Sequence, residues 1–182
     1  MRTFFVYMLI SMTGLLHLYT TARAQNPDRK FLKLLSPLDE PRGLCVDIPG
    51  HRNRVDIKKF LVLHTCKTGI WNIDEQFDAA AFRSGFLKMP EYQLCVRGVK
   101  TATGLKLKLA ECNSSEARWL FKNAFLRPYS FPKMCLTAGA GPSLLTPGGK
   151  RLPSRHVARG LILLPCDDKL NHRQRWQLID IE

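Results

Sequence analysis

Six cysteines are the residues of this sequence whose chemistry follows most directly from type and spacing. No two of them lie within the C-x-x-C spacing that is typical of zinc ligands and thioredoxin-like redox pairs. An even number of well-separated cysteines favours structural disulfides in an oxidising compartment, although counting alone leaves many pairings open. We therefore expect disulfides, no metal site and no cofactor. The cysteines are Cys45, Cys66, Cys95, Cys112, Cys135 and Cys166.

Two groups of basic residues could hold sulfate or phosphate. The chain has 28 Lys and Arg against 15 Asp and Glu, which gives a net charge of +13. A basic domain of this kind tends to accumulate on anionic surfaces, and ordinary surface charge with no partner is the alternative. Neither group has the aromatic interleaving that stacks unpaired bases, so nucleic acid is not an expected partner. The candidates are Arg52, Arg54, Lys58, Lys59, Lys150, Arg151, Arg155 and Arg159.

The sequence gives little support for a catalytic function. The sequence has no H-E-x-x-H, no G-x-S-x-G and no glycine-rich phosphate loop after a strand. The histidines are scattered, and an acidic pair such as Asp167-Asp168 is more typical of a solvated turn than of a general acid and base. We therefore do not expect an enzyme.

The first 24 residues have the pattern of a secretory signal peptide. A mostly apolar run from Phe4 to Leu18 is followed by an A-x-A cleavage pattern at Ala22-Arg23-Ala24. An uncleaved anchor is the alternative, but the run is shorter than the roughly 20 residues that a bilayer span needs. We expect cleavage before Gln25 and a secreted, extracellular protein. Asn113 begins a glycosylation sequon, which makes it a candidate glycosylation site.

One pattern occurs three times along the rest of the chain. A cysteine followed by Val or Leu leads through alternating apolar residues to a second cysteine and then to a closing aromatic residue. The three closing segments are Glu75-x-Phe77, Ala117-x-Trp119 and Gln174-x-Trp176. Because each unit contains two cysteines, the economical disulfides are 45–66, 95–112 and 135–166.

Each unit has about four short strand candidates with turn residues between them, and no convincing helix. Units of about 40 to 50 residues that cannot bury their own faces must share a core. About twelve short strands in a threefold arrangement predict a closed all-β body. A polar leader over 25–30 would precede a single domain over 31–182, with repeats at about 31–79, 80–124 and 125–182. The Gly- and Pro-rich excursion near 138–160 is expected to be a long loop, functional or mobile.

These features resemble the ricin-type (R-type) lectin domain, a β-trefoil whose three repeats each carry a disulfide and a Q-x-W motif. The resemblance covers roughly residues 31–180, and only the third repeat keeps the full Gln-x-Trp. It implies a β-trefoil fold with Phe77, Trp119 and Trp176 in the core. The segments that carry it are Cys45-Val46-Asp47-Ile48, Leu61 to Cys66, Leu105 to Cys112, Cys135-Leu136 and Gln174-Arg175-Trp176.

The resemblance also implies a shallow carbohydrate site in the first repeat. Asp47, two residues after the first cysteine, would accept hydrogen bonds from sugar hydroxyls, since an ionised carboxylate is a strong acceptor. His64 holds the position of the stacking ring, and Asp74 would complete the polar contacts. A solvated turn residue is the alternative role for Asp47. In the other repeats Arg97 and Thr137 stand in its place, which predicts degenerate or repurposed sites.

The sequence therefore predicts a secreted lectin that binds glycans or glycoconjugates non-covalently through its first repeat. One alternative is a basic trefoil that binds anionic, sulfated glycans, anionic cell surfaces or membranes. Another is a protein-interaction or inhibitor module that binds no sugar, because a fold does not fix a function. No particular oligomeric state is indicated.

Overall fold

The computed structural model describes residues 28–51, 54–69 and 71–181 of the chain. The predicted signal peptide and its cleavage site lie outside these residues, and so does Arg52. Within the described ranges, no helix is long and apolar enough to cross a membrane.

The prediction of an all-β fold is confirmed, with four strands of each repeat in the same order. The first repeat contains β1 (Arg29–Leu34), β2 (Leu44–Asp47), β3 (Val62–Thr65) and β4 (Gln76–Asp78). The second contains β5 (Lys88–Met89), β6 (Leu94–Thr101), β7 (Gly104–Ala110) and β8 (Trp119–Lys122). The third contains β9 (Phe125–Pro128), β10 (Met134–Ala138), β12 (Val157–Pro165) and β13 (Trp176–Ile179), with the extra strand β11 (Leu144–Leu145).

The helices are single turns between strands, which the strand-based prediction did not include. They are α1 (Ala79–Arg83), α2 (Pro147–Arg151) and α3 (Asn171–Gln174), with 3-10 turns η2 (Ile73–Glu75), η3 (Ser115–Ala117) and η4 (Asp168–Leu170). Each α-helix is too short to bury an amphipathic face, so the fold depends on the strands.

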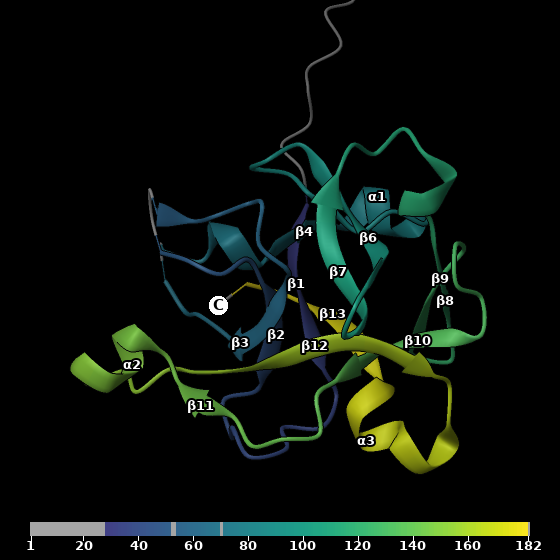
Figure 1. Ribbon diagram of the computed structural model, residues 1–182. Helices are drawn as coiled ribbons and strands as arrows, with labels where there is room; N and C mark the ends of the chain where they lie inside the picture. The colour runs from purple at the N-terminus through teal and green to yellow at the C-terminus, as the bar shows by residue number, and fades with distance from the viewer. Residues whose placement is uncertain (1–27, 52–53, 70, 182) are drawn as a thin grey trace, which may run out of the picture.

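The pairing of the strands joins the three repeats into one body. In each repeat the second and third strands form an antiparallel hairpin, β2 with β3, β6 with β7 and β10 with β12. The first strand β1 pairs with the last strand β13, which brings Phe31 opposite Ile179. Strand β12 also pairs with β3 and β7. Figure 1 shows β1 and β13 near the centre of the molecule, and β11 with α2 at its edge.

The closing aromatics of the repeats lie in the core, as predicted. Phe77, Trp119 and Trp176 are all buried. The indole N–H of Trp119 donates to the carbonyl of Val96 at 2.8 Å, and that of Trp176 donates to Leu136 at 2.9 Å. Each acceptor directly follows the first cysteine of its repeat. In the second and third repeats the motif therefore fixes the end of the repeat onto its own second strand, with the buried indole N–H satisfied.

The disulfide prediction is also confirmed, since the bonds are Cys45–Cys66, Cys95–Cys112 and Cys135–Cys166. Each bond joins the second strand of a repeat to the end of its third strand or the residues just beyond it. A local cross-link of this kind restricts the unfolded chain and stabilises each hairpin by roughly 3–4 kcal/mol.

Strand β1 begins at Arg29, inside the segment predicted as a polar leader. Arg29 pairs with Asp78 of β4, and its guanidinium donates to Gln76 Oε1 at 2.9 Å. The strand extends beyond its apolar residues because β4 offers a partner, which the sequence of the leader alone does not reveal.

The excursion of the third repeat folds back on the body instead of forming one long loop. Leu144 and Leu145 of β11 pair with Ala158 and Val157 of β12. Thr146 caps α2 by accepting a hydrogen bond from the N–H of Gly149 at 2.9 Å. A side chain at Gly149 would place its Cβ 2.0 Å from the carbonyl oxygen of His156, so glycine is required for this close approach.

Candidate functional site

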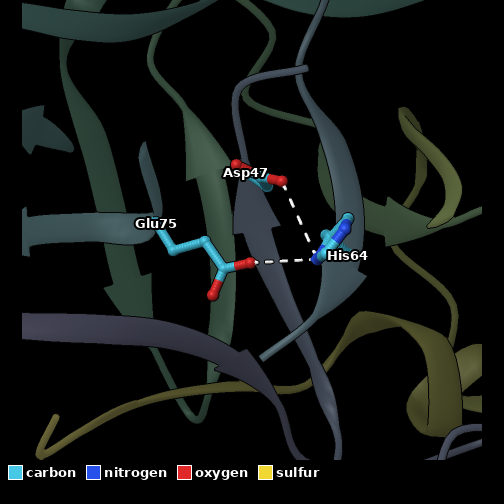
Figure 2. A group of neighbouring side chains, drawn as sticks. All are labelled: Asp47, His64 and Glu75. Atoms are coloured by element: carbon cyan, nitrogen blue, oxygen red, sulfur yellow. Dashed lines mark ion pairs between the residues drawn. The ribbon is translucent and has the colours of Figure 1, made fainter. Parts of the chain in front are cut away.

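The fold brings together the three residues predicted for the carbohydrate site. Asp47 ends β2, His64 lies on β3 and Asp74 belongs to η2. The side chain of Glu75 joins this group, and Figure 2 shows Asp47, His64 and Glu75 pointing toward one another. His64 Nδ1 lies 3.9 Å from Asp47 Oδ2 and 3.3 Å from Glu75 Oε1. Whether these residues contact a sugar remains a prediction.

Lys67 is the member of this group that the sequence reasoning missed. Its Nζ donates to Asp47 Oδ2 at 3.1 Å and to Asp74 Oδ2 at 2.7 Å, and lies 3.7 Å from Glu75 Oε1. Asp47 and Asp74 are only 1% and 2% exposed. Both carboxyl groups therefore accept hydrogen bonds from a buried ammonium group, and neither exposes its oxygens to a ligand.

Burial controls the protonation of this group. It raises the pKa of Asp47 well above the usual range for an aspartate and raises the pKa of Glu75 to about 8. Burial opposes charge on Lys67, but the fields of the three carboxylates outweigh it and raise the lysine pKa. Burial lowers the pKa of His64. At neutral pH the group therefore contains a charged lysine, a neutral histidine and at least one proton held by a carboxylate.

The equivalent places in the other repeats are not charged in this way. In the third repeat Gln174 Nε2 donates to Thr137 Oγ1 at 2.9 Å, which is a neutral pair where the first repeat has Glu75 and Asp47. In the second repeat Ala117 replaces the glutamate, and Arg97 pairs with Glu116 at 2.7 Å near the surface. Among the described residues, the buried charged cluster is therefore particular to the first repeat.

The donor atoms of Asp47, His64 and Glu75 lie within 4.8 Å of one another, a grouping that could suit a metal ion. The fit is poor for two reasons. Lys67 already supplies a positive charge beside both carboxylates. In addition, His64 Nδ1 lies 2.8 Å from the carbonyl oxygen of Thr65, so this nitrogen carries the proton and has no lone pair to offer.

A cleft of about 1090 Å³ opens above the cluster. Asp47, His64 and Lys67 contribute to its lining from the first repeat, while β11, α2 and the start of β12 line it from the third repeat. Trp71, whose place the sequence did not fix, is 45% exposed and also lines the cleft. The rings of His64 and His156 meet edge to face, with centroids 5.2 Å apart, where the two repeats come together.

The predicted basic candidates divide into three sets. Arg54, Lys59 and Arg151 line the cleft and are exposed. Arg159 also lines it, but the Arg159 guanidinium is buried and bonded to Asp39 at 2.8 Å and to the carbonyl of Gly139 at 2.7 Å, so it fixes the loop in place. Those that are exposed but outside the lining are Lys58, Lys150 and Arg155.

The glycosylation candidate Asn113 is exposed, and its amide donates to Glu111 at 2.8 Å. It lies in the turn after β7 and is not among the residues that line the cleft.

Comparison with known proteins identifies the fold. No family model and no curated protein matches the sequence. A lectin domain from Vibrio vulnificus hemolysin/cytolysin, solved with N-acetyl-D-lactosamine bound, is 13% identical with a TM-score of 0.55, covering 86% of this chain and 96% of its own. The earthworm lectin C-terminal domain, a mutant solved with 6'-sialyllactose, is 13% identical with a TM-score of 0.51, covering 84% and 98%.

The mdaA-1 domain is similar to the same extent, at 12% identity and a TM-score of 0.56, with 85% of this chain and 90% of that domain covered. These likenesses extend over nearly the whole length of each solved domain, at identities that establish the fold alone. The chain therefore has the β-trefoil fold of the Vibrio lectin domain.

Proposed function

We propose that this protein is a secreted glycan-binding protein whose ligand occupies the cleft above the first repeat. The observation that carries the proposal is the coincidence of two features at one place. The repeat whose residues match the carbohydrate motif also opens into the large cleft, and an exposed indole, that of Trp71, lines it. The glycans bound by the earthworm and Vibrio domains support a ligand of the same chemical class.

The proposed contacts differ from those implied by the resemblance. Asp47 and Asp74 are bonded to Lys67, so they act by holding the ammonium group in place. Lys67 has three N–H donors and directs two of them to these carboxylates. In the proposal its remaining donor bonds a sugar oxygen, while the indole of Trp71 covers an apolar face of the sugar ring. A single site of this kind binds weakly, and attachment to a clustered ligand would raise the avidity.

A second candidate ligand is an anionic glycan. Arg54, Lys59 and Arg151 line the same cleft, and Asp47, the one acidic side chain among the described lining residues, is paired with Lys67. Charge-assisted bonds from these side chains would favour sulfate or carboxylate groups on a sugar, and they would weaken as salt screens them.

A glycan array with neutral, sialylated and sulfated sugars, read at physiological and at high salt, tests both candidates. We expect Trp71→Ala to lose binding and Tyr129→Ala to retain it, because Tyr129 is 57% exposed but lies outside the cleft lining. Binding to neutral sugars that survives high salt supports the lectin. Binding to sulfated sugars alone that disappears at high salt supports the anionic candidate.

Retention of a neutral glycan by the Trp71→Ala variant would place its site elsewhere on the trefoil. Binding to no sugar by the folded wild-type protein would overturn the proposal and leave the protein-interaction module as the better explanation.

A further inference from the structure

The wall that the third repeat contributes to the cleft is apolar and exposed. Leu144 of β11 is 68% exposed and Leu152, at the end of α2, is 57% exposed. Both line the cleft together with Trp71 of the first repeat. A contiguous patch of exposed hydrophobic side chains is typical of a ligand-binding groove or an interaction site.

This wall is held in position rather than free to collapse. The main-chain N–H of Thr146 donates to the carbonyl of His156 at 3.0 Å, beside the pairing of β11 with β12. Asp39 of the first repeat accepts hydrogen bonds from the main-chain N–H of Ser143 at 2.7 Å and from its hydroxyl at 2.8 Å. The leucines therefore stay in contact with water unless a ligand covers them, and covering them is favourable.

The size of the cleft also exceeds what one sugar needs. Its volume of about 1090 Å³ is slightly above the roughly 300–1,000 Å³ typical of pockets for drug-sized ligands. Lys67 and His64 offer polar contacts to the same space that Leu144 and Leu152 line with apolar surface. A ligand that satisfies both kinds of surface must itself have a polar and an apolar part.

We propose that the ligand of this cleft is an amphiphilic glycoconjugate, in which a sugar is joined to an apolar alkyl or aryl group. This inference rests on the proposed glycan-binding function. The sugar lies against Lys67 and Trp71, and the apolar group lies against Leu144 and Leu152.

Titration calorimetry with matched methyl and octyl β-glycosides of galactose, lactose and N-acetylglucosamine tests the inference, with the octyl compounds kept below their micelle concentrations. We expect the octyl glycoside of a bound sugar to bind at least about tenfold more tightly than its methyl partner, because each buried methylene adds to the affinity. The double variant Leu144→Ser/Leu152→Ser should remove this gain and leave methyl glycoside binding unchanged.

Leu120→Ser is the matched control, since Leu120 is 42% exposed on β8 outside the cleft. It should keep the full octyl gain, and circular dichroism confirms that each variant is folded. Octanol supplies the apolar group without a sugar and should bind far more weakly than the octyl glycosides.

The outcomes separate the inference from the function on which it rests. Equal binding of methyl and octyl glycosides leaves the lectin intact and overturns the amphiphilic ligand. If the double serine variant still binds octyl glycosides more tightly than methyl glycosides, the apolar group does not lie against Leu144 and Leu152, and the inference is overturned. Octanol that binds as tightly as the octyl glycosides overturns the amphiphilic ligand, because the sugar then adds nothing to the affinity. Binding of none of the glycosides also overturns this inference, while the glycan array decides the glycan-binding function separately.

Discussion

Glu75 in the first repeat and Gln174 in the third hold equivalent positions, and each accepts a hydrogen bond from the main-chain N–H that follows the second cysteine of its repeat. Glu75 Oε2 accepts from Lys67 at 2.8 Å, and Gln174 Oε1 accepts from Asp167 at 3.0 Å. The amide nitrogen of Gln174 then donates to Thr137, whereas the second carboxylate oxygen of Glu75 has no hydrogen-bond partner. The first repeat thus has the ionisable residues Glu75 and Asp47 where the third repeat has Gln174 and Thr137, a neutral pair joined by a hydrogen bond.

Glu75→Gln should reduce the loss of stability that accompanies a rise in pH from 5 to 8. The pKa of Glu75 is raised from 4.5 to about 8 in the folded protein. The folded state therefore binds more protons than the unfolded state between these values, and the free energy of unfolding falls as the pH rises through that window. The substitution should lessen this fall between pH 5 and 8 by roughly 2–4 kcal/mol.

Urea denaturation at the two pH values measures the effect. The matched control is Glu111→Gln, which changes an exposed glutamate outside the cluster. An unchanged difference between pH 5 and pH 8 in Glu75→Gln would show that Glu75 does not titrate in this window.

Lys67→Met should destabilise the protein by about 3–5 kcal/mol at neutral pH, because it leaves buried carboxylates without their partner. The double variant Lys67→Met/Asp74→Asn should recover part of this loss, since it removes one of the stranded charges. A double-mutant cycle with Asp74→Asn alone gives the coupling between the two residues. Additive effects in this cycle would contradict the ion pair of 2.7 Å.

His156 should stay neutral well below the pH at which an ordinary histidine takes up a proton. Burial lowers its pKa from 6.5 to about 4, with a smaller contribution from His64. The unfolded state then binds more protons between pH 6.5 and 4, so the histidine makes stability fall as the pH drops through that range.

Proton NMR of the ring resonances measures the His156 pKa directly, and His156→Gln should flatten the acid side of the stability curve. His172, which is exposed, provides a second resonance for comparison in the same spectrum. A His156 resonance that titrates near pH 6.5 would show that the contact between the repeats is open in solution.

Expression of the full chain in a secretory host should release a protein that begins at Gln25, because the A-x-A pattern places the cleavage site after Ala24. Intact mass and N-terminal sequencing of the medium and the cell lysate measure this outcome, and Asn113→Gln accounts for any added glycan mass. Retention of an uncleaved chain in the membrane fraction would instead support the anchor alternative.

The features that could be predicted are those that recur in every repeat. The cysteine pairing and the buried closing aromatics follow from a pattern that occurs three times, so the interpretation of each repeat is strengthened by the other two. The nearness of Asp47 and His64 was instead implied by the family resemblance, and the β2–β3 hairpin and its disulfide place the two residues on neighbouring strands.

Several other features that occur in a single repeat were not predicted. Lys67 gave no signal, since one more lysine in a basic chain looks like surface charge until the carboxylates around it are in place. The wall around Leu144 was expected only as a long loop, because its position depends on pairing with β12 and on Asp39 of another repeat. Arg159 was a ligand candidate for the same reason, and its partner Asp39 is far away in the sequence.

Strand β12 belongs to the third repeat by sequence, yet it pairs with β3 of the first, and Ala158 lies opposite His64. The cleft therefore belongs to no single repeat, since its floor and its wall are encoded far apart in the sequence and are joined by this strand pair and by the contacts of Asp39 with Ser143 and Arg159. Grafting the first repeat into another trefoil would transfer the charged floor without the surface that faces it. The cleft thus requires the assembled trefoil, even though the fold itself is built from three similar repeats.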